Sequence, residues 1–441
     1  MDYITDFVVK EKYQYLSGFG SYHSSEAFQG AIPQVNNSPQ KPPFGLRTER
    51  LSGTSFTAPR SKSLQTWMYR VSSSLSHSEF VPYGDAPLVP SHMSPNGYMW
   101  PSLPVEEGQD WTQQKLLARN GDPANKRGTA IWIFSVTKNM QPQTVFSSLD
   151  GDSLIIVQAG AIDVQTELGK FLVRQNEIAV IPRGLRYRVT LASPHVRGYV
   201  CELFQGHWDL PELGPIGSTG LANVRDFQIP VACFDGTVDG DVARGNDAEW
   251  TILSRMNGQL WSCSQDHTPF DIVGWHGTYY PFKYDLARYC VMGNVKFDEH
   301  DPSLYAVLSA TTGDDAGASA VDFLVILPRW QVSNAFWLPY YHRNTHSEFY
   351  GPIINNQDPE FPPNQGLDFR PFAAGLHGMM TTHGAAEEDF HKARNADLEP
   401  TMLQNDGISI FLLETEKPLF LSQWAAEAAV KNSGTKPRAK M

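Results

Sequence analysis

Short apolar runs separated by turn residues are the feature that most constrains the fold of this chain. From Thr129 onward, five runs rich in Val, Ile, Phe and Tyr follow one another: TAIWIFSV, DSLIIVQAG, AIDVQTEL, GKFLVRQNEIAVIPRG and RYRVTL. Gly, Pro, Asn and Asp stand between them, as they do between the strands of β-sandwiches and barrels. The pattern predicts a mainly β fold, with the strands between Asp150 and Gly184 arranged as a meander that turns at Ala159-Gly160 and Leu168-Gly169.

A second strand-rich block predicts a second domain. It runs from near Tyr289 to the segment ISIFLLETEKPLFLS, whereas residues 1–110 are rich in turn residues. We therefore expect an N-terminal β-rich domain at 1–284, a C-terminal β-rich domain at 285–430 and a polar, disordered tail at 431–441. Helical periodicity is found mainly at Glu387–Asn395 and Gln423–Val430.

The composition excludes several classes of protein. A formal charge of −12 and a pI near 5.5 argue against a nucleic-acid or anionic-membrane partner. The longest apolar run, Phe323–Pro328, is far too short to span a bilayer, and the first residues lack the features of a secretory signal. The four cysteines are widely spaced and form no C-x-x-C pair, which favours buried thiols in a reducing cytosol.

Two stretches carry residues that could bind a metal. If Tyr340–Phe349 is a strand, His342, His346 and Glu348 project to the same side, because alternate side chains share a face. The stretch LHGMMTTHG adds His377 and His383. Two imidazoles and one carboxylate are the ligand set of non-heme Fe(II) oxygenases, and iron or manganese suits these donors better than zinc, magnesium or calcium. Spacing alone leaves His346 and His377 open as alternative ligands.

Long ordered matches give a family resemblance. They begin with YLSGFGSYHSSEAFQGAIPQVNNSPQ, ERLSGTSFTAPRS and WMYR, continue with LGPIGSTGLANVRDFQIPVA, HTPFDIVGWHGTYYPFKYDL and VDFLVILPRW, and end with PYYHRNTHSEFYGPI and LHGMMTTHG. In these segments, from about Tyr15 to Trp424, the chain resembles homogentisate 1,2-dioxygenases.

The resemblance implies a fold, a location and a set of roles. It implies an N-terminal β-rich domain followed by a cupin or jelly-roll-like barrel that holds Fe(II), in a cytoplasmic, trimer-based hexamer that serves phenylalanine and tyrosine breakdown. Matched by motif, His342, Glu348 and His383 are the iron ligands. The residues implied to surround the substrate are Tyr340, His377, His383 and Gln357.

Two segments depart from the family pattern. The family's catalytic base is the His of F-D-H-x-D-P-S, where this chain has Glu299 followed by His300. Either Glu299 acts as the base, or a one-residue shift of the segment brings His300 to that place. The family's substrate-contacting Tyr is replaced by Gln357, and His346 stands where relatives have an apolar residue.

These observations lead to three hypotheses. The first is O2-dependent cleavage of the homogentisate ring to maleylacetoacetate. The second is the same chemistry on another hydroquinone-like or secondary-metabolite aromatic, and the third is a metal-binding cupin without catalytic activity. An open-sided ligand triad speaks against the third, because purely structural metal sites tend to be coordinatively closed.

Overall fold

The protein is mainly β, as the strand pattern predicts. The computed structural model describes residues 5–34, 37–38, 42–52, 64–73, 81–82, 84–85, 97–100, 108–212, 214, 217–291, 304–312, 319–331, 346–353, 373–379, 399–403 and 409–432. Among these residues no helix is long and apolar enough to cross a membrane.

Three sheets of the described residues are built mainly from the N-terminal part of the chain. The nine-stranded sheet contains, in spatial order, β1 (Tyr15–Ser17), β16 (Gln228–Pro230), β22 (Phe282–Asp285), β13 (Glu177–Ile181), β10 (Asp152–Ala159), β15 (Val196–Leu203), β8 (Arg127–Val136), β7 (Lys115–Asp122) and β30 (Phe420–Leu421). A seven-stranded sheet contains β12 (Gly169–Arg174), β11 (Ala161–Thr166), β14 (Tyr187–Leu191), β9 (Thr144–Ser148), β19 (Trp250–Met256), β20 (Gln259–Gln265) and β5 (Val81–Pro82). The four-stranded sheet contains β2 (His23–Glu26), β21 (Ile272–Gly277), β4 (Gln65–Arg70) and β3 (Arg47–Ser52).

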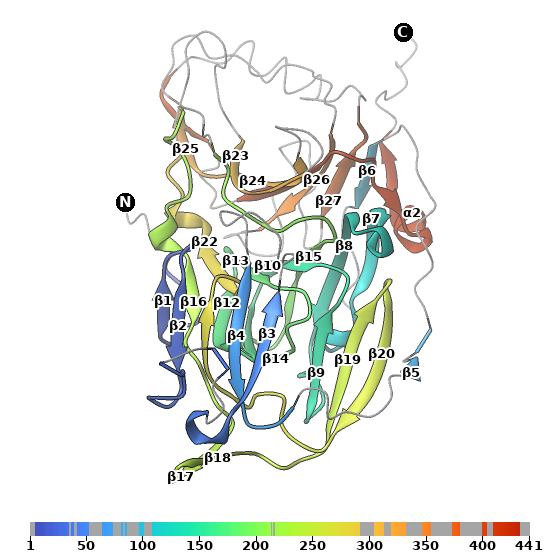
Figure 1. Ribbon diagram of the computed structural model, residues 1–441. Coiled ribbons are helices and arrows are strands. Elements are labelled where there is room, and N and C mark those ends of the chain that lie inside the picture. The colour runs from blue at the N-terminus through green and yellow to red at the C-terminus, as the bar shows by residue number, and fades with distance from the viewer. Residues whose placement is uncertain are drawn as a thin grey trace, which may run out of the picture.

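A further sheet is built mainly from the C-terminal part and is called the C-terminal sheet. Its described strands are, in spatial order, β23 (Tyr305–Thr311), β24 (Ser319–Ile326), β29 (Ile410–Thr415), β26 (Ser347–Pro352), β27 (Ala374–His377), β6 (Gly97–Trp100) and β31 (Val430–Asn432). Smaller elements are the pairs β17 (Gly236–Asp239) with β18 (Val242–Gly245) and β25 (Arg329–Gln331) with β28 (Thr401–Leu403), the helix α2 (Gln423–Ala428) and the 3-10 turns at Pro43–Gly45, Trp111–Gln113, Pro123–Asn125, Val224–Asp226 and Leu286–Arg288. The C-terminal sheet lies across one end of the N-terminal sheets (Figure 1).

The central strands form where the sequence is apolar on both faces. In β10, the run Leu154–Val157 has no exposed residue, and its neighbours β13 and β15 are similarly buried. A strand covered on both sides reads as a continuous apolar run rather than an alternation. One apolar core therefore extends from these strands to Phe323 and Phe411 of the C-terminal sheet.

The predicted meander is wrong at its first turn. Strand β10 pairs with β13 and β15, whereas β11 pairs with β12 and β14 in the other sheet. The chain crosses between the sheets at Gly160, which has φ +82° and whose absent Cβ would lie 2.4 Å from the His195 carbonyl oxygen. Only glycine fits this crossing, because the conformation is left-handed and the backbone approaches closely. The Leu168-Gly169 turn does join paired strands, β11 and β12.

Strands from each end of the chain cross into the sheet of the other part. The early strand β6 pairs with β27 and β31 in the C-terminal sheet, and the late strand β30 pairs with β7 in the nine-stranded sheet. The Trp100 indole N–H also donates to the Ala425 carbonyl at 2.8 Å. Figure 1 shows α2, β6 and β7 close together on one side of the molecule. Lys431 and Asn432, which we expected to begin the disordered tail, instead belong to β31. The predicted helix at Glu387–Asn395 lies outside the described residues, and α2 matches the one predicted at Gln423–Val430.

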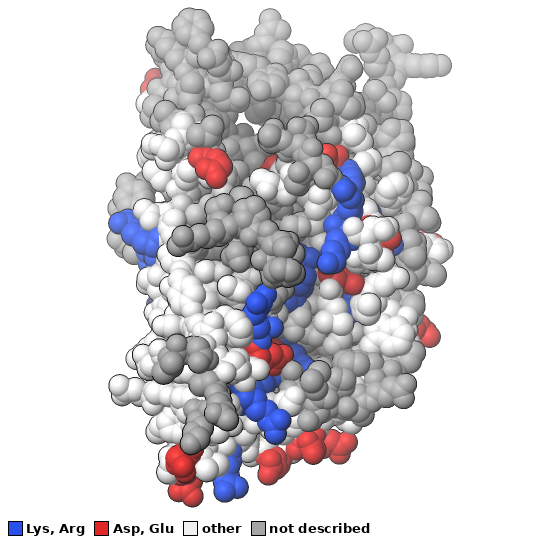
Figure 2. Space-filling model, in the orientation of Figure 1, with Lys and Arg blue, Asp and Glu red and all other residues white. Residues whose placement is uncertain are grey.

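Charged side chains of both signs occur on the surface. Figure 2 shows basic and acidic side chains interspersed among uncharged ones on the described part of the face that it draws.

Candidate metal centre

The structure describes three of the residues singled out in the two metal-binding stretches. His346 directly precedes β26, Glu348 is the second residue of that strand, and His377 is the last residue of β27. The remaining predicted site residues lie outside the described part of the chain: Glu299, His300, Tyr340, His342, Gln357 and His383. Because β26 begins at Ser347, His346 precedes the strand, so strand alternation does not fix the side to which it points.

Glu348 is a buried carboxylate on an interior strand of the C-terminal sheet. Its exposed fraction is 5%, and β26 is hydrogen-bonded on both sides, to β27 and to β29. The next residue, Phe349, packs against Trp100, Tyr199 and Phe411 in the main core. Because neighbouring side chains of a strand point to opposite faces, Glu348 projects from the face away from that core.

The strand register places polar residues in one row across this face. His377 is the partner of Glu348 on one side and Glu414 is its partner on the other. Asp322 is in turn the partner of Glu414, and Ser309 that of Asp322. Directly paired residues of antiparallel strands share a face, so the row brings an imidazole and three carboxylates to the same side of the sheet.

Hydroxyl groups form hydrogen bonds with one carboxylate of the row. Asp322 accepts hydrogen bonds from Ser309 Oγ at 2.5 Å and from Ser319 Oγ at 2.6 Å. Sequence reasoning did not single out Asp322 or Glu414, because each is a lone acid in an apolar run. Strand geometry over IFLLET would place Glu414 on the same face as Ile410 and Leu412, but only the register shows that it lies beside Glu348.

An apolar floor borders the polar row. Tyr350, Ile410 and Leu412 form a buried cluster with Met99 and Leu324. Tyr350 follows Glu348 by two residues and therefore lies on the same face. Burial raises the pKa of the Tyr350 phenol, and the Glu348 charge raises it further.

The N-terminal sheets support the site strands from beneath. Gln158 Nε2 donates to the Pro352 carbonyl at 2.9 Å, and Gln175 Nε2 donates to the Ile353 carbonyl at 3.1 Å. Tyr199 packs between Phe349 and Phe411. These contacts fix the strand that carries Glu348 to a rigid base, which suits a ligand that must hold a defined position.

Nearly the whole chain matches one family in two consecutive parts. The family model described as homogentisate 1,2-dioxygenase N-terminal matches residues 14–286, and the one described as homogentisate 1,2-dioxygenase C-terminal matches residues 287–436. The chain belongs to the homogentisate 1,2-dioxygenase family.

Relatives from distant organisms match over nearly their full length. The homogentisate 1,2-dioxygenase of Emericella nidulans is 47% identical over 97% of this chain and 94% of its own. That of Drosophila melanogaster is 40% identical, with 95% of each chain covered, and that of Dictyostelium discoideum is 39% identical over 94% of this chain and 93% of its own.

Similar solved structures are more distant. The protein Ylba from E. coli has a TM-score of 0.32 and 9% identity, covering 74% of this chain and 94% of its own. A cupin 2 conserved barrel domain protein from Leptotrichia buccalis has a TM-score of 0.28 and 8% identity, covering 71% of this chain and 92% of its own. TM-scores and sequence identities this low support no inference about the site.

Of the three metal ligands that the resemblance implies, the structure describes one, Glu348. Within the described ranges, no group of three or more His, Cys, Asp and Glu side chains is arranged to hold a metal ion. Glu348 nevertheless suits a divalent cation, since it is a buried carboxylate with a second carboxylate, Glu414, on the adjoining strand. A dication would relieve the repulsion between like charges that face each other across strands. The donors are therefore compatible with the metal that the homogentisate dioxygenase motifs imply.

Proposed function

We propose that this protein is an Fe(II)-dependent dioxygenase that opens the aromatic ring of homogentisate to give maleylacetoacetate. The observation that carries the proposal is the family match over residues 14–436 combined with the buried position of Glu348, the carboxylate of the ligand motif. The names of the three relatives favour homogentisate over another hydroquinone, and they favour an enzyme over a metal-binding cupin without activity.

The proposed iron ligands are His342, Glu348 and His383. When bound, Fe(II) would supply adjacent coordination positions for the substrate and O2. The backbone of Glu348 is held in place, because β26 is paired with β27 on one side and with β29 on the other. Holding two reactants side by side contributes up to roughly 7–11 kcal/mol to lowering the barrier in favourable cases.

The remaining residues have proposed roles toward the substrate. The apolar side chains Leu412 and Ile410 exclude water from the floor on which an aromatic ring can lie. Tyr340, His377 and Gln357 would contact the ring and its substituents. Glu299 or His300 would accept the phenolic proton, and a positioned base of this kind typically contributes about 10²–10⁴-fold.

The function is tested by O2 uptake. Protein loaded with Fe(II) is mixed with homogentisate while the ultraviolet absorbance of the ring-opened product is recorded. We expect one O2 consumed for each ring opened. Fully loaded protein that consumes no O2 with homogentisate would contradict the proposal, and other hydroquinones would then be screened.

The ligand and base assignments are tested by paired variants. His383→Ala is expected to lose bound iron, whereas His377→Ala retains it, as measured by iron content per subunit. Glu299→Gln and His300→Gln are compared by kcat at saturating homogentisate, and the larger loss identifies the base. Iron retained by His383→Ala would refute the ligand assignment.

The assembly and location complete the proposal. We propose a homo-oligomer, in the form of a trimer-based hexamer, in the cytoplasm, where phenylalanine and tyrosine are degraded. Sedimentation equilibrium of the purified protein tests the hexamer directly.

A further inference from the structure

We propose that Tyr350 is a positioning residue for the substrate side of the centre and acts through the His377 imidazole, on which it stacks. The inference deepens the proposed function and rests on it. Tyr350 is not part of the ligand set and lies two residues beyond Glu348 on β26.

The two rings lie parallel and close together. Their centroids are 5.1 Å apart and their planes differ by 25°. Tyr350 is paired with Gly375, and His377 is paired with Glu348, so the two rings meet across a diagonal of the β26–β27 ladder. Diagonal neighbours on one face are within reach when a side chain is aromatic.

Gly375 creates the space that the tyrosine ring occupies. A Cβ at this position would lie 2.3 Å from Cζ of Tyr350 and 2.4 Å from its hydroxyl oxygen. No other residue could stand opposite Tyr350 without displacing the ring. The absence of a side chain at Gly375 therefore leaves room for the Tyr350 ring, two residues before His377 on β27.

The far end of Tyr350 is also held. Its hydroxyl lies 3.3 Å from Sδ of Met99 on β6, and the residue is only 8% exposed. Leu412 packs against it from the opposite strand, β29. The tyrosine ring is thus held by residues of β6, β27 and β29, and the histidine ring stacked on it lies nearly parallel to it.

The stack restricts the plane of the imidazole without occupying its hydrogen-bonding edge. Both ring nitrogens of histidine form hydrogen bonds within the plane of the ring, whereas stacking uses the face. An imidazole already held in one orientation loses less conformational freedom when it binds a substrate group. The expected effect of removing the stack is therefore on substrate binding rather than on iron binding.

Three variants separate this role from a loss of packing. Tyr350→Leu removes the aromatic face, and Gly375→Ala displaces the ring from the opposite strand. Leu308→Ala removes a completely buried side chain from β23 of the same sheet, away from Tyr350 and His377, and is the matched control. For each variant we would measure KM and kcat with homogentisate, iron per subunit, Tm and the Kd of homogentisate under nitrogen.

We expect Tyr350→Leu and Gly375→Ala to raise KM and Kd by about three- to tenfold with full iron content. Tyr350→Phe, which keeps the ring, should recover most of that loss, and Leu308→Ala should lower Tm without a comparable rise in KM. A KM and Kd for Tyr350→Leu equal to those of the wild type, or equal rises in Tyr350→Leu and Leu308→Ala, would overturn the inference. Absence of O2 uptake by the iron-loaded wild type would instead overturn the proposed function.

Discussion

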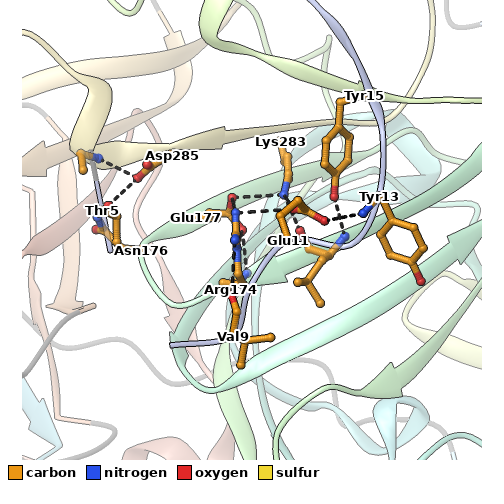
Figure 3. Close-up of polar contacts among 12 residues, drawn as sticks. Thr5, Val9, Glu11, Tyr13, Tyr15, Arg174, Asn176, Glu177, Lys283 and Asp285 are labelled. Carbon is orange, nitrogen blue, oxygen red and sulfur yellow. Dashed lines mark hydrogen bonds and ion pairs between the residues drawn. The ribbon is translucent and has the colours of Figure 1, made fainter. Parts of the chain in front are cut away.

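Lys283 is an ammonium group buried completely among ion partners. Its Nζ lies 2.8 Å from Glu11 Oε2 and 3.1 Å from Glu177 Oε1, and Glu177 also pairs with the Arg174 guanidinium at 2.8 Å (Figure 3). Glu11 belongs to residues 5–14, whose side chains alternate between part-buried and exposed. The network therefore fastens the first described residues of the chain to β12, β13 and β22.

Removing one charge from this network should be costly. Glu177→Gln leaves Lys283 and Arg174 buried with too little negative charge, and breaking a buried pair in this way typically costs about 3–5 kcal/mol. We expect a loss of this size in the free energy of unfolding, measured by urea titration.

A surface pair provides the control. Lys10 and Asp6 also form an ion pair, but their side chains are 75% and 93% exposed. Exposed pairs contribute about 0–1 kcal/mol, so Lys10→Gln should change stability very little. Equal effects of the two variants would show that burial does not determine the strength of the network.

Asp150 makes stability depend on pH. Burial raises its pKa to about 6, helped by the Glu202 charge and opposed by hydrogen bonds from the Asn257 and Gly258 backbone and by the Arg255 charge. The unfolded value is about 3.9. Because the folded pKa is raised, the contribution of this group is complete below about pH 4 and is lost as the pH rises through 6.

An amide at this position cannot titrate, so Asp150→Asn should remove that dependence. Between pH 4.5 and 7.5 the wild type should lose roughly 2 kcal/mol relative to the variant, followed by thermal unfolding at each pH. The comparison uses the change with pH, because the amide also forfeits one backbone hydrogen bond at every pH. Parallel curves for the two proteins would contradict the assignment.

At the scale of elements, the strand β6 is the joint between the two parts of the molecule. Trp100 is completely buried, contacts Phe349 and donates a hydrogen bond to the backbone of α2. Trp100→Ala should therefore destabilise the protein by about 3–5 kcal/mol, as large-to-small changes of aromatic residues do. Tyr22→Ala serves as a control, because that ring is 59% exposed. If chemical denaturation gave similar losses of stability for Trp100→Ala and Tyr22→Ala, the proposed importance of β6 for stability would be wrong.

Elements with strong local signals are the ones that the sequence predicts well. The segments that form β8, β10 and β29 each contain at least four consecutive apolar residues, and β11 alternates with period two, so each indicates a buried strand without tertiary information. The four residues of β6 stand among turn residues, and nothing local indicates a strand or its distant partners β27 and β31. The predicted turn of the meander at Gly160 is wrong for the same reason. A turn residue does not indicate whether the next strand stays in the same sheet or enters another.

The site divides in a similar way. Spacing suggested that Glu348 and several histidines could meet, and left His346 and His377 open as ligands. Motif resemblance made the selection that spacing could not. The partnership of Glu348 with His377 and Glu414 depends on register between segments far apart in the chain, which a single sequence does not encode in any short pattern.

At the scale of the whole molecule, bound metal should couple to stability. A ligand that binds only the folded state stabilises it by about 2.7 kcal/mol at a hundred times its Kd. Treatment with a chelator is therefore expected to lower Tm, and anaerobic addition of Fe(II) should restore it. His383→Ala should show neither change. A Tm of the wild type that does not respond to chelation or to iron would contradict the proposed metal centre.

The crossing of β6 and β30 into opposite sheets also bears on how the protein is made. Strand β6 leaves the ribosome early, but its neighbours β27 and β31 are synthesised much later. Strand β7 likewise waits for β30 before that edge is paired. Neither part can complete its sheet until these late strands have been synthesised, so the nascent chain exposes unpaired strand edges until Asn432 has emerged. The interval between the synthesis of β6 and that of β31 is thus the time at which this protein is most vulnerable to aggregation and most dependent on chaperones.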